Sequence, residues 1–177
     1  MTYHSDTAAN AAGFNLSAVK LLVETPADLE RLTELHELVF GPGRFAKTAF
    51  RLREGKQPRY DLSKLAWQAC GQDDRLAGAV RMTDIVIGGR AAVLLGPLCV
   101  RPELKGLGLG RALMAAAMQA AWQAGDQAVL LVGDAAYYAA FGFKQAADVQ
   151  LPGPADPERT LIALNGGNVA GWTGKVA

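Results

Sequence analysis

The stretch RPELKGLGLGRALM (101–114) carries three glycines at alternate positions, Gly106, Gly108 and Gly110. Near a helix each glycine costs about 0.5–1 kcal/mol relative to alanine, so bare backbone at this place needs a functional reason. The first N–H groups of a helix have no internal partner, and glycines let an anion approach them without a Cβ in the way. Because Lys105 and Arg111 lie on either side, the stretch predicts a phosphate-binding turn.

Two common phosphate-binding motifs do not fit this turn. A P-loop has four residues between its glycines and then Gly-Lys-Ser/Thr, and GLGLGRAL has neither that lysine nor a hydroxyl. The dinucleotide fingerprint G-x-G-x-x-G fails on spacing, because the three glycines are evenly spaced. A nucleotide-binding protein stays as an alternative, which predicts that ATP or NAD raises the melting temperature while CoA does not.

The elements that position the turn follow from the hydrophobic pattern. Runs 62–70, 75–89 and 90–100 read as strands of an antiparallel meander, joined by QDD and GG turns. The turn then opens a helix over 108–124, and the apolar run 127–132 is typical of a strand buried on both faces. The helix is long enough to be a crossover, so we expect 90–100 and 127–132 to be parallel.

The remaining segments are expected to add a strand (19–26), an amphipathic helix after Pro26, a basic helical segment (44–60), a short helix (134–143) and two closing strands (144–151 and 159–166). The apolar stripe of the amphipathic helix is formed by Leu29, Leu32, Leu35, His36 and Val39, with Thr25 as its cap. The predicted fold class is therefore α/β (α+β), a mixed, mostly antiparallel sheet of six to seven strands with helices on both faces. We expect a flexible leader over 1–17 and a single domain over 18–177.

Composition excludes several other classes. A net charge of +1 gives no argument for nucleic acid or for an anionic membrane. Cys70 and Cys99 lie in apolar runs, where we expect buried structural thiols rather than a disulfide or a nucleophile. With only two histidines besides, no metal site is expected. No signal peptide or membrane span is recognisable, so we expect a cytoplasmic protein.

The turn and a second motif together resemble the GNAT family of N-acetyltransferases. V-R-P-E-L-K-G-L-G-L-G-R-A-L (100–113) is similar to the family's acetyl-CoA turn, (Arg/Gln)-x-x-Gly-x-(Gly/Ala), with Lys105 at the Arg/Gln position. Downstream, Tyr138-Ala-Ala-Phe-Gly142-Phe143 matches the family's Tyr-x-x-x-Gly-Phe element. One helix and one strand separate the two motifs, as in the family, and the order of elements agrees from residue 19 to about 164.

The resemblance implies acetyl-CoA as co-substrate, without a metal, and a direct attack by a primary amine in a ternary complex. The implied acetyl-CoA site consists of Leu98, Cys99, Val100, Lys105, Gly106, Leu107, Gly108, Leu109, Gly110 and Arg111. The thioester would lie where strand 90–100 separates from 127–132, and Gly96 and Pro97 fit a bulge there. Tyr138 is the implied acid that protonates the leaving thiolate.

Several points stay open at this stage. Strand 90–100 has no carboxylate, so the general base is Asp84, Glu37, His36 or a chain of water molecules. Many family members have an asparagine where Leu131 stands, and Asp134 or backbone groups are the possible substitutes. The basic segment 44–60 is either a solvated helix face or a surface that meets an acidic substrate. The acceptor is a small-molecule or peptide amine, the protein is a monomer or homodimer, and a catalytically silent acyl-CoA sensor is the alternative function.

Overall fold

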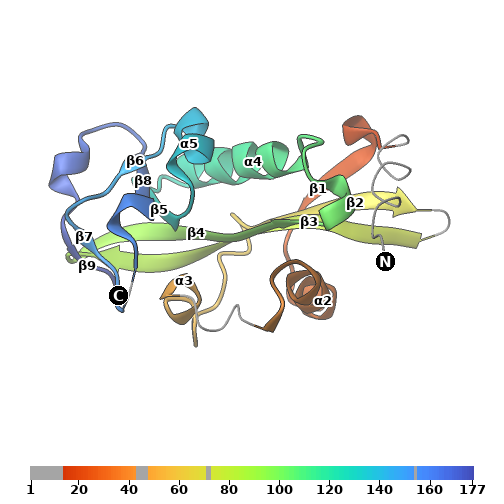
Figure 1. The fold of residues 1–177 in the computed structure, drawn as a ribbon, viewed down its shortest axis with the longest axis horizontal. Helices are drawn as coiled ribbons and strands as arrows, with labels where there is room; N and C mark the ends of the chain where they lie inside the picture. The colour runs from red at the N-terminus through yellow and green to blue at the C-terminus, as the bar shows by residue number, and fades with distance from the viewer. Residues whose placement is uncertain (1–13, 43–47, 71–72, 154) are drawn as a thin grey trace, which may run out of the picture.

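The computed structural model describes residues 14–42, 48–70, 73–153 and 155–177. Its centre is a seven-stranded sheet in the order β1-β2-β3-β4-β5-β8-β6. Figure 1 shows α4 and α5 on one face of this sheet and α2 and α3 on the other. The predicted fold class, a mixed and mostly antiparallel sheet with helices on both faces, is confirmed.

The predicted meander is present as β2 (Lys64–Cys70), β3 (Asp73–Ile87) and β4 (Arg90–Val100), all antiparallel. Gly88 and Gly89 form the tight turn between β3 and β4, with φ of +54° and +86°. β1 (Val19–Val23) pairs with β2 and forms one edge of the sheet.

The helical crossover is also confirmed. A 3-10 turn (Pro102–Leu104) and α4 (Leu109–Gln123) connect β4 to β5 (Ala128–Val132), and the two strands are parallel. After β5 come α5 (Ala135–Tyr138), β6 (Lys144–Gln145) and β8 (Thr160–Leu164), and β8 pairs antiparallel with both β5 and β6.

The core is divided between the two faces of the sheet. One cluster packs α4 on the sheet, with Leu109, Leu113 and Met114 all fully buried. A smaller cluster on the opposite face packs α2 (Leu29–Phe40) through Leu32 and Leu35. The sheet therefore separates two apolar layers, one on each face.

Some predicted boundaries are wrong in detail. Leu29 is 56% exposed instead of lying on the apolar stripe of α2, because residues 26–28 form a 3-10 turn before the helix begins. In the basic segment, the described helix is only α3 (Thr48–Arg51). The closing strand 144–151 is divided into β6 and β7 (Val149–Gln150), because residues 147–148 form a turn after Ala146, whose N–H still donates to the Thr160 carbonyl of β8.

The C-terminal tail contributes more structure than its sequence pattern indicates. β9 (Gly174–Lys175) pairs in parallel with β7 in a second, two-stranded sheet. Trp172 is buried, and the Arg90 guanidinium lies 3.9 Å from the centre of its ring. Within the expected leader, residues 1–13 lie outside the described part, whereas Leu16–Ala18 form a 3-10 turn and Phe14 packs against the core.

Among the described helices, none combines the length and the apolarity that a membrane span requires. The described residues also contain no cluster of three or more His, Cys, Asp or Glu side chains suited to hold a metal ion.

Candidate acyl-CoA site

The glycine turn has the backbone that the sequence predicts for an anion site. Gly106 and Gly108 have φ of +81° and +87°, a conformation that residues with a Cβ rarely adopt. Gly108 is the N-cap of α4, so the first free N–H groups of this 15-residue helix follow it directly. The helix dipole adds partial positive charge at the same point.

A cavity of about 330 Å³ lies against this turn. It is lined by Leu98, Cys99, Val100, Leu104, Lys105, Gly106, Gly108, Gly110, Arg111 and Tyr137. All but two of the ten residues implied for acetyl-CoA therefore lie on one surface. The exceptions are Leu107 and Leu109, whose side chains pack in the core, so that only their backbone can serve the site.

β4 separates from β5 next to this cavity. The parallel pairing consists of Val93 with Val129 and Leu94 with Leu130, and beyond Leu94 no further pair joins the two strands. On its other edge β4 has a bulge, because Arg81 of β3 lies opposite both Gly96 and Pro97. The expected separation and the expected bulge are both present, and together they open a gap in the middle of the sheet.

A second cavity of about 330 Å³ occupies this gap, and Tyr138 lines it together with Gly96, Leu98 and Gly133. A Cβ at Gly133 would lie 2.2 Å from the Tyr138 ring, so only glycine leaves room for this tyrosine. Burial raises the pKa of Tyr138 to about 12, with a smaller contribution from Tyr137. Its phenol is therefore protonated throughout the neutral range.

Tyr137 lies between the two cavities and lines both. Its ring packs edge-on against Tyr138, with centroids 4.8 Å apart. Its hydroxyl lies 3.2 Å from the position that a Cβ on Gly110 would occupy. Tyr137 was not predicted as a site residue, although it directly precedes the motif tyrosine in the sequence.

A third cavity, of about 470 Å³, opens on the face covered by α2 and α3. Phe40, Ala49, Arg53 and Pro97 line both this cavity and the one in the gap. Leu98 and Tyr137 in turn connect the gap to the glycine turn. Through these shared lining residues the three cavities adjoin one another in series, from the N-terminus of α4, through the gap, to the opposite face of the sheet, and we call this series the path.

The comparisons with known proteins agree with this geometry. Residues 66–145 match the acetyltransferase (GNAT) domain family. By this match, segment 66–145 is assigned to the GNAT acetyltransferase domain family. The matched segment begins in β2 and ends in β6, so it includes both motifs and the gap between β4 and β5. A search of curated protein sequences found no match.

Solved structures give the same assignment over most of the chain. The GNAT family N-acetyltransferase YhbS of Escherichia coli, in complex with CoA, is 27% identical, with a TM-score of 0.75 over 90% of this chain and 88% of its own. A GNAT family acetyltransferase of Brucella melitensis, in complex with acetyl-CoA, is 24% identical (TM-score 0.69, 90% and 94% covered). Naa50 of Arabidopsis thaliana, in complex with the bisubstrate analogue CoA-Ac-MVNAL, shares the fold at 17% identity (TM-score 0.52, 82% and 95% covered).

The GNAT domain brings only one of the three candidate bases to the path. His36 lines the third cavity, whereas Glu37 lines none of the three among the described residues. Asp84 accepts a hydrogen bond of 3.0 Å from Arg59, in a network that also contains Asp61 and Asp126. That network is outside the lining of all three cavities, so Asp84 is not placed to act on the acceptor.

The residue at the family's asparagine position, Leu131, lines the cavity in the gap but offers no polar side-chain group there. Leu131 is 1% exposed and packs in the core between α4 and the sheet. Asp134, the possible substitute, lines the gap, but its Oδ1 accepts the Tyr137 N–H at 3.0 Å as the cap of α5. The backbone of β4 and β5 and the side chains of Arg53 and Arg159 therefore remain as sources of polar contacts here.

The two cysteines differ in a way that the sequence did not predict. Cys99 is 3% exposed, and burial raises the pKa of its thiol to about 12. Cys70 is exposed, because it lies at the open end of β2, so the expectation of a buried thiol is wrong there. A reactive thiolate at Cys99 is disfavoured by its burial.

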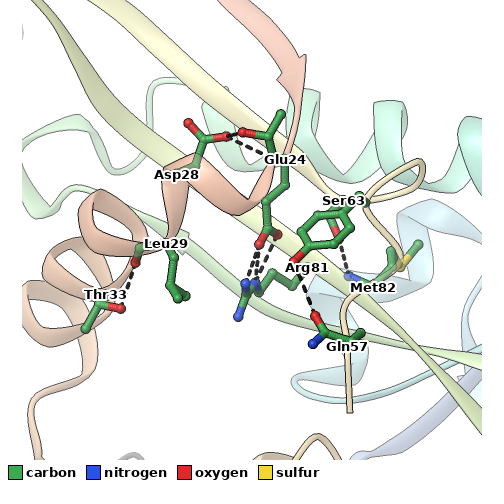
Figure 2. A network of polar contacts seen from close by, with 10 residues as sticks. Glu24, Asp28, Leu29, Thr33, Gln57, Ser63, Arg81 and Met82 are labelled. Atoms are coloured by element: carbon green, nitrogen blue, oxygen red, sulfur yellow. Dashed lines mark hydrogen bonds and ion pairs between the residues drawn. The ribbon is translucent and has the colours of Figure 1, made fainter.

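An ion pair with a buried carboxylate lies beside the gap on the α2 side and was not predicted from the sequence. Figure 2 shows the carboxylate of Glu24 facing the guanidinium of Arg81, whose Nε lies 2.9 Å from each carboxylate oxygen. Glu24 is 1% exposed at the end of β1. Next to Arg81, the N–H of Met82 donates to the buried Ser63 Oγ at 3.0 Å. These contacts fix the strand that lies opposite the bulge.

Proposed function

We propose that the protein is an N-acetyltransferase that moves the acetyl group of acetyl-CoA to a primary amine by direct attack in a ternary complex. The observation that carries this proposal is the series of adjoining cavities from the glycine turn, through the gap in the sheet, to the far face. Such a path lets donor and acceptor enter from opposite sides and meet in the gap. We further propose a cytoplasmic enzyme that is active as a monomer or homodimer.

The residues along the path fit the parts of acetyl-CoA. The pyrophosphate would bind the free N–H groups at the start of α4, with Lys105 and Arg111 as exposed cations at the same cavity. The pantetheine amides would bind the edge of β4 at Leu98–Val100, which has lost its pairing with β5. The thioester would then lie in the gap, where an N–H of β4 can polarise its carbonyl.

In the reaction the amine nitrogen forms a bond to the acetyl carbon, and the bond from carbon to sulfur breaks. The leaving thiolate takes the phenol proton of Tyr138, and the proton of the attacking nitrogen leaves to water. Because its pKa is raised, the Tyr138 phenol is protonated at neutral pH, so that the proton is present when the thiolate forms. His36, the one candidate base that lines the cavity on the acceptor side, is placed to assist there.

The test is a transfer assay that measures release of free thiol from acetyl-CoA across a library of primary amines, with mass spectrometry of the product. Thiol release with an acetylated amine supports the proposal. A thermal-shift panel with CoA, ATP and NAD runs beside it. A shift with CoA but no transfer to any amine would favour an acyl-CoA sensor, and a shift with ATP or NAD alone would contradict the donor site.

A further inference from the structure

An arginine that has no carboxylate partner among the described residues lies where the cavity on the α2 face, proposed here for the acceptor, meets the gap. Arg53 follows α3 and lines both the cavity on the α2 face and the cavity in the gap. Its Nη1 is 3.6 Å from the position that a Cβ on Gly96 would occupy, directly at the bulge of β4. The guanidinium is therefore close to the place proposed for the thioester.

The neighbouring arginine differs in its partners. Arg81 lines the same cavity, but its charge is compensated by the buried Glu24. No carboxylate of the described residues lies within ion-pairing distance of Arg53. Burial, together with the nearby charge of Arg81, lowers the pKa of Arg53 to about 10, so it is still a cation at neutral pH. Holding an uncompensated cation here costs stability, which indicates a functional reason.

Many of the other residues that line the cavity on the α2 face are apolar, and one more of them is a cation. The apolar part of the lining consists of Phe40, Ala49, Phe50, Pro58 and Pro97. Lys56 adds a second positive side chain, and Glu54 is the only acidic side chain among the lining residues. A ligand that complements these walls has an apolar body and a negative group. Polycations are repelled.

We propose that Arg53 binds the carboxylate of the acceptor, and that the acceptor is an amino acid with an apolar side chain. This inference rests on the proposed acetyl transfer and names its substrate class. A planar guanidinium binds a carboxylate through two parallel hydrogen bonds. In an α-amino acid the amine is a few bonds from the carboxylate, so a carboxylate on Arg53 places the nitrogen at the mouth of the gap. The apolar side chain then lies among the phenylalanines and prolines.

The kinetic test compares wild type with Arg53→Gln on matched acceptors. L-Phenylalanine and L-leucine are assayed against 2-phenylethylamine and isopentylamine, which lack the carboxylate, and against spermidine. We expect wild type to prefer the amino acids, and Arg53→Gln to lose about tenfold to hundredfold in kcat/KM for them alone. Arg51→Gln is the control, because Arg51 is exposed at the end of α3, two residues before Arg53, and is not among the residues that line the three cavities.

A binding measurement separates this inference from the proposed function. Calorimetric titration of the CoA-saturated protein with each of the twenty amino acids needs no turnover. Binding of apolar amino acids that Arg53→Gln weakens and Arg51→Gln leaves unchanged supports the carboxylate site, even if no transfer occurs. The inference is wrong if none of the twenty binds, if amines without a carboxylate bind or react equally well, or if Arg53→Gln instead weakens CoA.

Discussion

The two faces of the sheet offer a ligand different parts of the chain. On the α4 face, the site is made of backbone: a turn with two left-handed glycines, the N-terminus of a helix and the edge of β4. On the α2 face, the site is made of side chains, with Arg53, Arg81 and Lys56 among aromatic and proline walls. Among the described residues, the cavity in the gap between β4 and β5 is the part of the path that residues of both faces line.

This difference has a physical consequence for substitution. A backbone site tolerates many side-chain changes but depends on conformation, which glycine supplies at the turn. A side-chain site changes its ligand with each substitution while the sheet and helices stay as they are. We therefore expect changes on the two faces to separate cleanly in their effects on CoA, on acceptor and on stability.

The largest effect is expected at the gap, where the two faces meet. Tyr138→Phe removes the phenol proton and keeps the ring that packs against Gly133 and Phe143. We expect kcat to fall about 10²–10⁴-fold, the usual contribution of a general acid, with CoA affinity nearly unchanged. Steady-state thiol release and the CoA-induced shift in melting temperature measure the two quantities.

The adjacent tyrosine provides the internal comparison for that result. Tyr137→Phe removes a hydroxyl that lines the same gap and the donor cavity. If this variant loses more kcat than Tyr138→Phe, the acid is Tyr137 and our assignment is wrong. If neither variant changes kcat, the tyrosines only pack.

On the α2 face we expect the next largest effect, on stability rather than on CoA. Glu24→Gln leaves the Arg81 guanidinium without its buried counter-charge, and breaking such a pair costs about 3–5 kcal/mol. Urea unfolding measures the change in the free energy of unfolding. The CoA-induced shift should remain, because the pair lies on the face opposite α4.

The pair also has a control in its double variant. Glu24→Met with Arg81→Met removes both charges, and we expect it to recover most of the stability lost by Glu24→Gln. A double variant as unstable as the single one would mean that the loss comes from packing and not from the unpaired charge.

On the α4 face the effect should be confined to the donor. Gly108→Val introduces a branched side chain at a φ of +87° beside the free N–H groups of α4. Gly89→Val introduces the same side chain at +86° in the β3–β4 turn, far along the sheet. We expect both to lose about 1–2 kcal/mol or more of stability from strain. Only Gly108→Val should weaken CoA, by tenfold or more, measured by calorimetry.

The backbone site was predictable from sequence because its signal is local. Glycines at alternate positions, the helix that follows them and the tyrosine motif all lie within about forty residues, and each keeps its meaning without tertiary context. The bulge at Gly96 and Pro97 was predictable for the same reason, since a proline lacks the N–H of a strand ladder. The expected fold and the resemblance to the GNAT family followed from these short-range patterns.

The side-chain site was not predictable, because distant segments assemble it. Glu24 and Arg81 are 57 residues apart, and nothing in either neighbourhood indicates the other. Arg53 was one of six cations in a segment expected to be helical, and only the fold shows that it turns toward Gly96. Tyr137 was separated from Tyr138 by one position, which periodicity could not resolve in a helix of four residues.

Cys99 offers the smallest and most selective test, because it belongs to both faces. It lines the donor cavity from β4, yet its side chain packs in the cluster under α2. Its pKa is about 12 in the folded protein and about 9 when exposed, so its contribution to stability is fully present below pH 9. Above pH 9 the unfolded chain loses the thiol proton while the folded protein keeps it, and stability falls by about 1.4 kcal/mol per pH unit at most.

Between pH 8 and pH 10 we therefore expect the free energy of unfolding, measured with urea, to fall less in Cys99→Ala than in wild type. The difference between the two falls should be roughly 1 kcal/mol. Cys70→Ala is the control, since the exposed Cys70 thiol should leave the pH dependence as in wild type. CoA binding should be unchanged in both variants. In the proposed site CoA contacts the backbone of β4, whereas the Cys99 side chain packs on the opposite face. A Cys99→Ala variant that loses CoA affinity would show that side chains enter the donor site, and the division between the two faces would not hold.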